Sequence, residues 1–474
     1  MAGQWSGTRG RVRASERPAR PNRSAMRASL WEGVWSNGSE NMMAPFIPMY
    51  ALSLGAGPAL IGLVSSIPAL VGNLFQIPAA RLAERFGHRR LYRLGNAGRL
   101  LWLLPGLIPF LHLPTETAVA ILIVLLVLRT TMVSMAVPAW TALMAQAVPM
   151  RIRGRYFANR NLLACLASLI GSAVAGWLVR LGGFPAGYSA LFGLAALAGL
   201  FSFINASRMP ELSPRVAHAP SSRPQDPESH APATVSPGAH LSLRDRIRGA
   251  ARFFGPDQPF SRYVLTSFLW TFSVNLPAPL FAVHFKQGLG GDEAIWGLVT
   301  ASGMAMQMVG QRYWGRRTVT MGDRNIVLVA GIGAACVPLL WSIAPAPGWA
   351  FGAEMIGGLA WSGYNLAAFT LLLRLLPPGQ QAGPVAFYNT MVGIAQGLGP
   401  MVGGVLVGFL GNRGMFVLSG VMRLLALALF ARTVSVAGTP ALRIKHLRPY
   451  RHGRPAVRLK PRRVSLPAVL RRGE

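Results

Sequence analysis

The stretch P-A-A-R-L-A-E-R-F-G-H-R-R, from Pro78 to Arg90, separates two long apolar runs. The first run ends near Ala80, a burst of charged residues with one glycine follows, and the second run begins near Leu91. A short, arginine-rich loop of this kind is typical of a tight hairpin between two membrane-spanning helices, because arginines beside a span keep their loop on the cytoplasmic side. We therefore expect the chain to cross a membrane.

The composition agrees with this expectation. Of the 474 residues, 52% are hydrophobic and only 13% are charged, which is too apolar for a water-soluble protein of this length. The net charge of +32 alone would suggest a nucleic-acid partner. The basic residues, however, lie at the two ends and in short loops between apolar runs, as in membrane proteins with basic inner loops. We therefore expect no nucleic-acid partner.

Twelve apolar runs are long enough for a bilayer span, which needs about 20 residues. The loops at 81–99, 151–160 and 316–324 are basic, whereas the loops around Gly55, Pro114, Gly182 and Pro345 carry no Lys or Arg. An even number of spans then places both termini in the cytoplasm. The expected spans lie near 29–53, 58–80, 91–112, 117–146, 158–180, 186–206, 261–284, 294–314, 325–344, 348–375, 385–410 and 414–433.

The segments outside the spans are polar or basic. We expect a disordered basic arm at 1–28, a first six-helix bundle at 29–206, a cytoplasmic linker at 207–260, a second bundle at 261–433 and a basic cytoplasmic tail at 434–474. Within the linker, 241–254 predicts an amphipathic helix on the inner leaflet. The arginines of this helix and of the tail favour contact with anionic lipids of that leaflet. Met1 and Met26 are both candidate start residues.

The two halves of the chain repeat each other. Ile61–Ser65 matches Trp296–Thr300 at an offset of 235 positions, and Gly87 and Arg89 meet Gly322 and Arg324 at the same offset. Nearby offsets of 234 and 229 align further residues in order, including Asn41 with Asn275. Two copies that begin on the same side of the membrane correspond to a parallel-repeat transporter plan.

The hairpin resembles the loop between the second and third helices of the major facilitator superfamily, where a small residue, an Asp-Arg pair, a Gly and two basic residues follow in fixed order. Ala80 and Glu84 stand for the usual Gly and Asp, and Arg85, Gly87, Arg89 and Arg90 complete the motif. The resemblance extends over 29–433, linker excepted. It implies an all-α integral membrane fold with twelve transmembrane helices in two pseudo-symmetric six-helix bundles, around a cavity that opens to each side in turn.

The same resemblance implies a role for the hairpin residues. In the family, the acid of the motif engages the start of the eleventh helix when the inner side is closed. Glu84, Arg85, Gly87, Arg89 and Arg90 would then form a cytoplasmic gate. The alternative is that these arginines only fix the topology of the loop.

Two opposite charges lie deep in the first bundle. Glu40 and Arg129 are each about 11–12 residues into the first and fourth spans, so at about 1.5 Å rise per residue they share a depth. A charge at this depth is costly unless it is paired. In the family that the hairpin resembles, the first and fourth helices both border the cavity and lie near each other. The resemblance therefore implies that these two side chains face each other, either as a proton-coupling switch or as a static ion pair. In drug–proton antiporters a Gly follows the arginine by four residues, and Val133 stands there instead.

A polar stripe on the first span and its repeat mate predict the solute site. Asn37, Asn41 and Asn275 are the expected substrate contacts, with Trp361 and Asn365 of the tenth span as a further lining face. The alternative is that small polar residues join helices together.

The sequence contains no phosphate-binding loop of the form G-x-x-x-x-G-K-[ST] and no zinc-protease or hydrolase motif. Cys165 and Cys336 have no spacing partner, so we expect no metal site, cofactor or catalytic residue. The prediction is a multi-pass secondary transporter of a small organic solute in the plasma (cell inner) membrane, with proton-coupled efflux as one mode. The alternatives are uptake or facilitated movement of a polar metabolite, and a non-transporting sensor or scaffold on the same fold.

Overall fold

The computed structural model describes residues 22–210, 258–376 and 382–435, and each of the twelve expected spans falls on helix within these ranges. The first half contains α1 (Arg23–Met43), α2 (Ile47–Ser53), α3 (Pro58–Phe86), α4 (His88–Ala97), the 3-10 segments η1 (Gly98–Leu103) and η2 (Pro105–Leu111), α5 (Thr115–Ala147), α6 (Met150–Gly182) and α7 (Ala186–Ser207). The expected disordered arm at 1–28 lies outside the described residues up to position 21, but residues 23–28 are not disordered, because they form the first turns of α1.

The second half contains α9 (Pro259–Asn275), α10 (Leu280–Val283), the π-helical η3 (His284–Gly288), α11 (Glu293–Met321), α12 (Asp323–Ser342), α13 (Trp349–Leu375) and α14 (Ala382–Thr433). α14 is one continuous assignment, but its backbone turns at Gly411, where φ is 65°. The two expected spans at 385–410 and 414–433 lie on either side of this turn. The amphipathic helix expected at 241–254 and the tail beyond 435 lie outside the described residues.

Nine helical segments of the described chain are long and apolar enough to cross a membrane. One of them, 387–433, includes both arms of α14. The first and eighth expected spans are not among these nine segments, because α1 carries acidic and amide side chains and the apolar residues of α11 are interspersed with Gly, Ser and Gln.

Helix breaks in the first and seventh spans coincide with proline. α1 ends two residues before Pro45, and α9 ends two residues before Pro277. Proline removes a backbone donor and disfavours helix at the residue before it, which explains both ends. The first and seventh spans are thus broken at equivalent sites of the two repeats.

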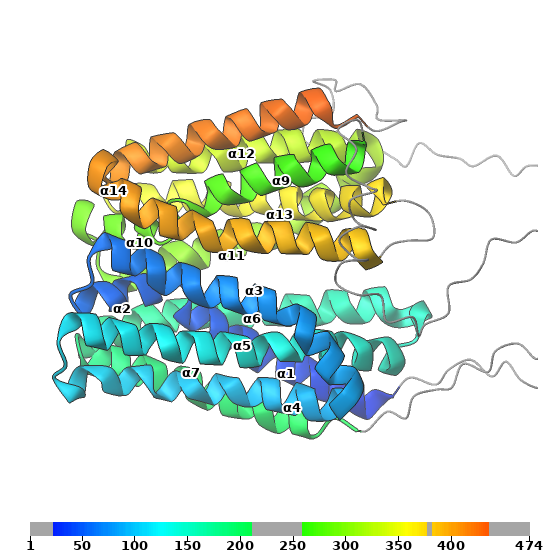
Figure 1. Cartoon of the computed structure of the whole chain (residues 1–474), viewed down its shortest axis with the longest axis horizontal. Coiled ribbons are helices and arrows are strands. Elements are labelled where there is room, and N and C mark those ends of the chain that lie inside the picture. Colours follow the sequence, from blue (N-terminus) through cyan, green and yellow to red (C-terminus); the bar gives the residue numbers. More distant parts are fainter. Residues whose placement is uncertain (1–21, 211–257, 377–381, 436–474) are drawn as a thin grey trace, which may run out of the picture.

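The helices form two bundles that lie side by side (Figure 1). α3 packs against α14 and α6 against α11 across the boundary between them. We call the end that carries the turns at Gly87 and Gly322 the hairpin end, and the end that carries Gly55 and Gly290 the opposite end. Near the opposite end the indole of Trp296 donates to the Pro45 carbonyl at 2.9 Å, and Arg180 Nη1 lies 3.6 Å from Asp292 Oδ2.

Glycines allow this close approach. A Cβ on Gly62 would lie 2.5 Å from the Pro400 carbonyl oxygen, and a Cβ on Gly176 would lie 2.3 Å from the Glu293 carbonyl oxygen. Both contacts join one bundle to the other near the opposite end. The described bundles are therefore closely packed at that end.

Candidate functional site

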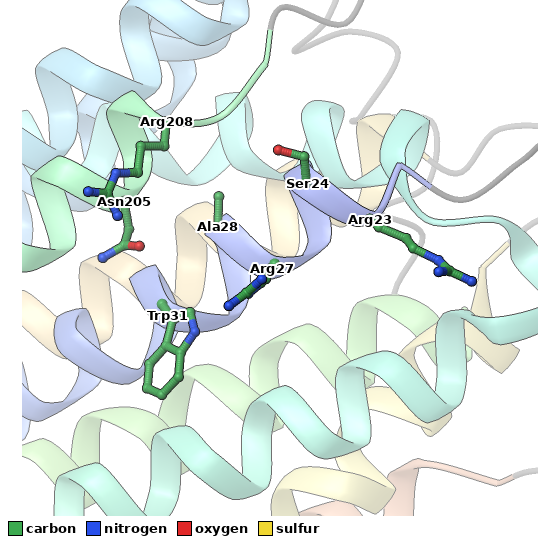
Figure 2. Close-up of a pocket in the computed structure, with 7 residues that line it drawn as sticks. All are labelled: Arg23, Ser24, Arg27, Ala28, Trp31, Asn205 and Arg208. Carbon is green, nitrogen blue, oxygen red and sulfur yellow. The ribbon is translucent and has the colours of Figure 1, made fainter.

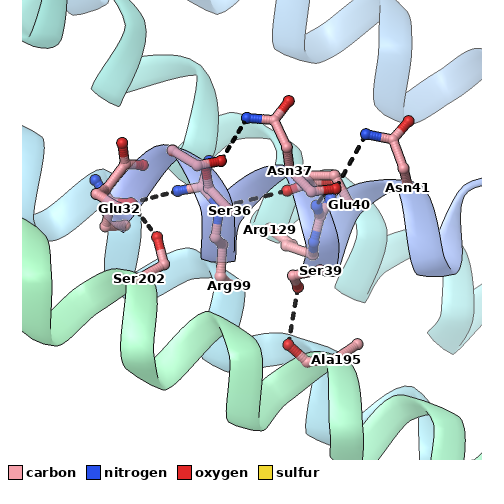
Figure 3. Close-up of polar contacts among 12 residues, drawn as sticks. Glu32, Ser36, Asn37, Ser39, Glu40, Asn41, Arg99, Arg129, Ala195 and Ser202 are labelled. Carbon is pink, nitrogen blue, oxygen red and sulfur yellow. Dashed lines mark hydrogen bonds and ion pairs between the residues drawn. The ribbon is translucent and has the colours of Figure 1, made fainter. Parts of the chain in front are cut away.

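Glu40 of α1 faces two arginines inside the first bundle (Figure 3). Arg129 of α5 donates from Nη2 to Glu40 Oε2, and Arg99 Nε of η1 lies 3.6 Å from Glu40 Oε1. The shared depth of Glu40 and Arg129 is thus accompanied by direct contact. Arg129 also lies over the Trp102 ring, with its guanidinium carbon 3.8 Å from the ring centroid. Three helical segments therefore supply one charge cluster.

This cluster is unequal in charge and in exposure. Two guanidinium groups face one carboxylate, and the side chains of Arg99 and Arg129 are only 10% and 7% exposed. The Glu40 side chain is 32% exposed, so it is the most accessible side chain of the cluster. Within the described chain, Glu40 Oε1 and the Nε atoms of both arginines make no hydrogen bond. Buried charges normally carry further hydrogen bonds, so Glu40 Oε1 has the capacity to take up a proton or accept a hydrogen bond, and the two Nε–H groups have the capacity to donate one.

Arg99 was not predicted as a site residue. Its position eight residues inside the third expected span was the available signal, but the sequence analysis assigned it to the basic loop. Arg99 Nη1 donates to Asn96 Oδ1, and Asn96 Oδ1 also accepts from Ser202 of α7 at 3.1 Å. These contacts hold Arg99 in the interior of the bundle.

A second ion pair on the same helix was also not predicted. Glu32 of α1 accepts from Arg160 Nη2 of α6 at 3.1 Å, and both side chains are nearly buried. Arg160 Nε donates to the Ser29 carbonyl at 3.1 Å, and its guanidinium carbon lies 4.6 Å from the Trp140 ring centroid. A Cβ on Gly33 would lie 2.6 Å from the guanidinium carbon of Arg160, so glycine gives this arginine its room.

A cavity of about 340 Å³ lies in the second bundle, between α9, α13 and α14. Three of the expected substrate contacts, Asn275, Trp361 and Asn365, line it together. Trp361 packs edge-on against Trp270, whose ring stacks on Tyr364 with centroids 4.6 Å apart. No Asp, Glu, Lys, Arg or His is among the lining residues. The cavity thus combines aromatic surface with uncharged hydrogen-bonding groups.

α14 contributes lining residues that the sequence analysis missed. Tyr388, Asn389 and Gln396 face the same cavity. Gln396 Oε1 accepts from Asn73 Nδ2 of α3 at 3.1 Å, which joins the cavity wall to the first bundle. Amides at positions 389 and 396, seven residues apart in an apolar run, were the signal for this face, because they lie on one side of a helix.

Asn37 and Asn41 lie elsewhere, on α1. Asn37 Nδ2 donates to the Gly33 carbonyl at 2.8 Å. Asn41 Nδ2 donates to the Asn37 carbonyl and to Ser168 Oγ of α6, both at 3.0 Å. Neither residue lines the cavity in the second bundle. The five expected substrate contacts are therefore divided between the two bundles.

The hairpin residues are partly described. Gly87 has φ 88° and precedes α4, and Gly322 has φ 74° and precedes α12, so the turn recurs in both repeats. This backbone region favours glycine. Arg85 and Arg90 are exposed, whereas Arg89 Nη2 donates to the Ser207 carbonyl of α7 at 3.4 Å. The side chain of Glu84 lies outside the described part.

The match to a known protein family covers both halves of the chain. A family model described as Major Facilitator Superfamily matches the chain twice, over residues 35–274 and 263–470. None of the curated proteins compared with the sequence matches it.

Solved transporter structures share the fold at low sequence identity. A D-xylose-proton symporter superposes with a TM-score of 0.68 at 14% identity, covering 88% of this chain and 99% of that one. A POT family transporter in complex with 5-aminolevulinic acid gives 0.65 at 12% identity, with coverages of 87% and 97%. A bacterial homologue of the human lysosomal transporter Spinster, inward-facing and unoccupied, gives 0.61 at 15%, with coverages of 86% and 95%.

Proposed function

The chain belongs to the Major Facilitator Superfamily of membrane transporters, and on this premise we propose that it moves a small, uncharged, polar organic solute across the membrane by alternating access. The same membership makes it a transporter rather than an enzyme. We place it in a plasma (cell inner) membrane with both termini in the cytoplasm, on the strength of its basic hairpin-end loops.

The cavity in the second bundle carries the proposal. Its volume of about 340 Å³ is at the lower end of the range for small-molecule sites. Amides from three helices offer donors and acceptors, and Trp361 offers an aromatic face against which a ring can pack. An ionised solute would meet no opposite charge there, whereas an uncharged polar solute would satisfy the amides on binding. We propose Asn275, Trp361 and Asn365 as substrate contacts, with Asn37 and Asn41 joining from the first bundle in another state of the cycle.

The aromatic wall also favours a second candidate. Trp270, Trp361, Tyr364 and Phe369 give the cavity a large apolar surface, which suits an amphipathic compound that is exported in exchange for protons. A sensor or scaffold on the same fold is the third candidate. It would tolerate replacement of the cavity amides without loss of function.

Alternating access is consistent with the contacts between the bundles. The cross-bundle contacts at Trp296, Arg180 and Gly176 gather near the opposite end. In our proposal the bundles rock about the cavity and exchange these contacts for others at the hairpin end. Glu84, Arg85, Gly87, Arg89 and Arg90 would then gate the hairpin end, with the Glu84 carboxylate at the start of α14, where a helix N-terminus favours an anion.

We further propose that Glu40 is the proton-coupling residue and that Arg129 is its partner. Its side chain is the most exposed of the cluster, and its buried oxygen Oε1 makes no hydrogen bond there. Protonation would leave Arg99 and Arg129 as two buried positive charges without a compensating anion, which is a costly arrangement. Movement of α1 and α5 would relieve that cost and so link the proton to rocking. The alternative is a static pair that only stabilises the bundle.

A thermal-stability screen of the purified protein in detergent tests the solute class. The panel contains sugars and polyols, amino acids, organic acids and amphipathic drugs, each at two pH values. A ligand at about 100 times its dissociation constant adds roughly 2.7 kcal/mol to the folded state, which is measurable. Stabilisation by uncharged polar compounds supports the proposal, stabilisation by drugs alone supports the efflux candidate, and stabilisation by organic anions alone contradicts the uncharged class.

Transport is then measured in proteoliposomes with the best ligand of the screen. Accumulation driven by an imposed pH gradient supports proton coupling. Equilibration that ignores the gradient supports facilitated movement. Binding without any transport, in vesicles shown to be sealed and to contain protein, would favour the sensor.

A further inference from the structure

A cavity of about 470 Å³ lies at the hairpin end of the first bundle, between the start of α1 and the end of α7 (Figure 2). Three arginines line it, Arg23 and Arg27 from α1 and Arg208 from the residue after α7. All three are exposed, and the lining contains no acidic residue. Within the described part of the chain, no carboxylate lies within ion-pair distance of any of the three. The site thus offers three positive charges that have no acidic partner among the described residues.

The positions on α1 indicate how a ligand would lie. Arg23, Arg27 and Trp31 follow one another at intervals of four residues, so they share one face of the helix. Trp31 also lines the cavity and is 46% exposed. It lies about 12 Å along the helix from Arg23, at a rise of about 1.5 Å per residue. Basic groups at the outer end and an exposed indole one or two turns deeper match the headgroup level of a bilayer.

An apolar surface continues from the cavity along α7. Leu197, Leu200 and Phe201 are 48%, 39% and 40% exposed. The Phe201 ring stacks on Trp35 of α1 with centroids 4.8 Å apart, so the two helices meet along this surface. A free anion would use the arginines only. A molecule with an anionic head and an acyl chain would use both the arginines and the apolar surface.

We propose that this cavity binds the headgroup of one anionic phospholipid, with the phosphate among Arg23, Arg27 and Arg208 and an acyl chain along Trp31 and the exposed face of α7. The lipid would lie in the inner leaflet if the hairpin end is cytoplasmic. Because the lipid bridges the first and sixth spans, it would hold the first and last helices of the first bundle together at the membrane surface. This site is separate from the solute cavity and from the Glu40 cluster.

Native mass spectrometry of the full-length protein in detergent, titrated with phosphatidylglycerol, tests the proposal. The test variant is Arg23→Gln/Arg27→Gln/Arg208→Gln. The control Arg93→Gln/Arg312→Gln/Arg432→Gln removes the same charge from exposed arginines outside the cavity. The control accounts for diffuse attraction of lipid to the strongly basic chain. Phosphatidylcholine and inorganic phosphate are titrated in parallel.

The expected result is that the wild type and the control retain one phosphatidylglycerol with similar affinity, and that the test variant binds it at least about tenfold more weakly, since each arginine near an anionic headgroup contributes severalfold. Equal loss in the test and control variants would overturn the site. Equal affinity for phosphatidylcholine, or displacement of the lipid by millimolar phosphate, would overturn its assignment to an anionic lipid. Should the triple variant not fold, the single variants Arg27→Gln and Arg93→Gln give the same comparison with a smaller difference. The measurement does not depend on transport. It therefore tests the lipid site even if the proposed transport function is wrong.

Discussion

Arg89 and Arg324 make the same contact in the two repeats, each with the end of the last helix of its own bundle. Arg89 Nη2 donates to the Ser207 carbonyl at the end of α7 at 3.4 Å. Arg324 Nε and Nη2 donate to the Val434 and Ala431 carbonyls at the end of α14, at 2.8 and 2.6 Å. The last carbonyls of a helix lack partners within the helix and carry partial negative charge, so a guanidinium there satisfies both needs.

Loss of this contact should destabilise the second bundle. We expect Arg324→Gln to lower the free energy of unfolding by about 1–3 kcal/mol, because two charge-assisted hydrogen bonds are lost. Arg324→Lys should retain only part of the stability that Arg324→Gln loses, since an ammonium lacks the planar fork of donors. The measurement is thermal unfolding in detergent, with Arg316→Gln on the same hairpin as the control. Equal melting temperatures for the Arg324→Gln and Arg316→Gln variants would contradict the role.

Glu40→Gln should separate binding from coupling. Gln keeps the shape of the side chain but cannot exchange a proton, so we expect solute binding and exchange to persist while accumulation driven by a pH gradient is lost. Proteoliposome uptake with and without a gradient measures this. Glu116→Gln changes an exposed acid at the start of α5 and serves as the control. Normal accumulation in Glu40→Gln would contradict proton coupling at this residue, and the wild-type pair would then have a structural role only.

The Glu32–Arg160 pair predicts a stability effect that is not additive. Arg160→Gln leaves the buried Glu32 carboxylate without its partner and should cost about 3–5 kcal/mol. The double variant Glu32→Gln/Arg160→Gln removes both charges and should be more stable than Arg160→Gln alone. Melting temperatures of the wild type, the two single variants and the double variant complete the cycle. A double variant as unstable as the sum of the singles would show that the two side chains are not coupled.

The cavity predicts which asparagines determine affinity. Asn275→Ala and Asn365→Ala each remove a hydrogen-bonding group, so we expect the dissociation constant of the solute to rise by up to about tenfold in each. Trp361→Ala should raise it by a similar factor through lost ring contact. Ligand-dependent shifts of the melting temperature provide the comparison, with the exposed Asn159→Ala as control. If Asn37→Ala and Asn41→Ala weaken binding while the three cavity variants do not, the site lies in the first bundle instead.

Gly176→Ala should disturb the contact between the bundles. The added Cβ would lie 2.3 Å from the Glu293 carbonyl oxygen, so α6 and α11 must separate near the opposite end. We expect greater labelling of cysteines introduced at that end in the variant. Gly193→Ala on α7 is the control, because its Cβ would meet nothing within 4 Å. Unchanged labelling in Gly176→Ala would show that the interface adapts without opening.

Much of the fold was predictable because its determinants are local. The length and spacing of the apolar runs located the helices. The repeat at an offset of 235 positions predicted that the Gly87 turn recurs at Gly322. Depth along the helix placed Glu40 and Arg129 at one level, and the resemblance to a family in which the first and fourth helices are neighbours matched them to each other.

The sequence, with the family resemblance that it carries, therefore determined where the helical segments lie along the chain, the repeat and one ion pair. Only the tertiary structure decided which polar faces meet. It turned Arg99 towards Glu40, paired Glu32 with Arg160, and gathered Asn275, Trp361 and Asn365 with Gln396 of α14 while leaving Asn37 and Asn41 on α1. The reason is that helical periodicity defines which residues share a face, whereas the rotation of each helix about its axis follows from packing against its neighbours.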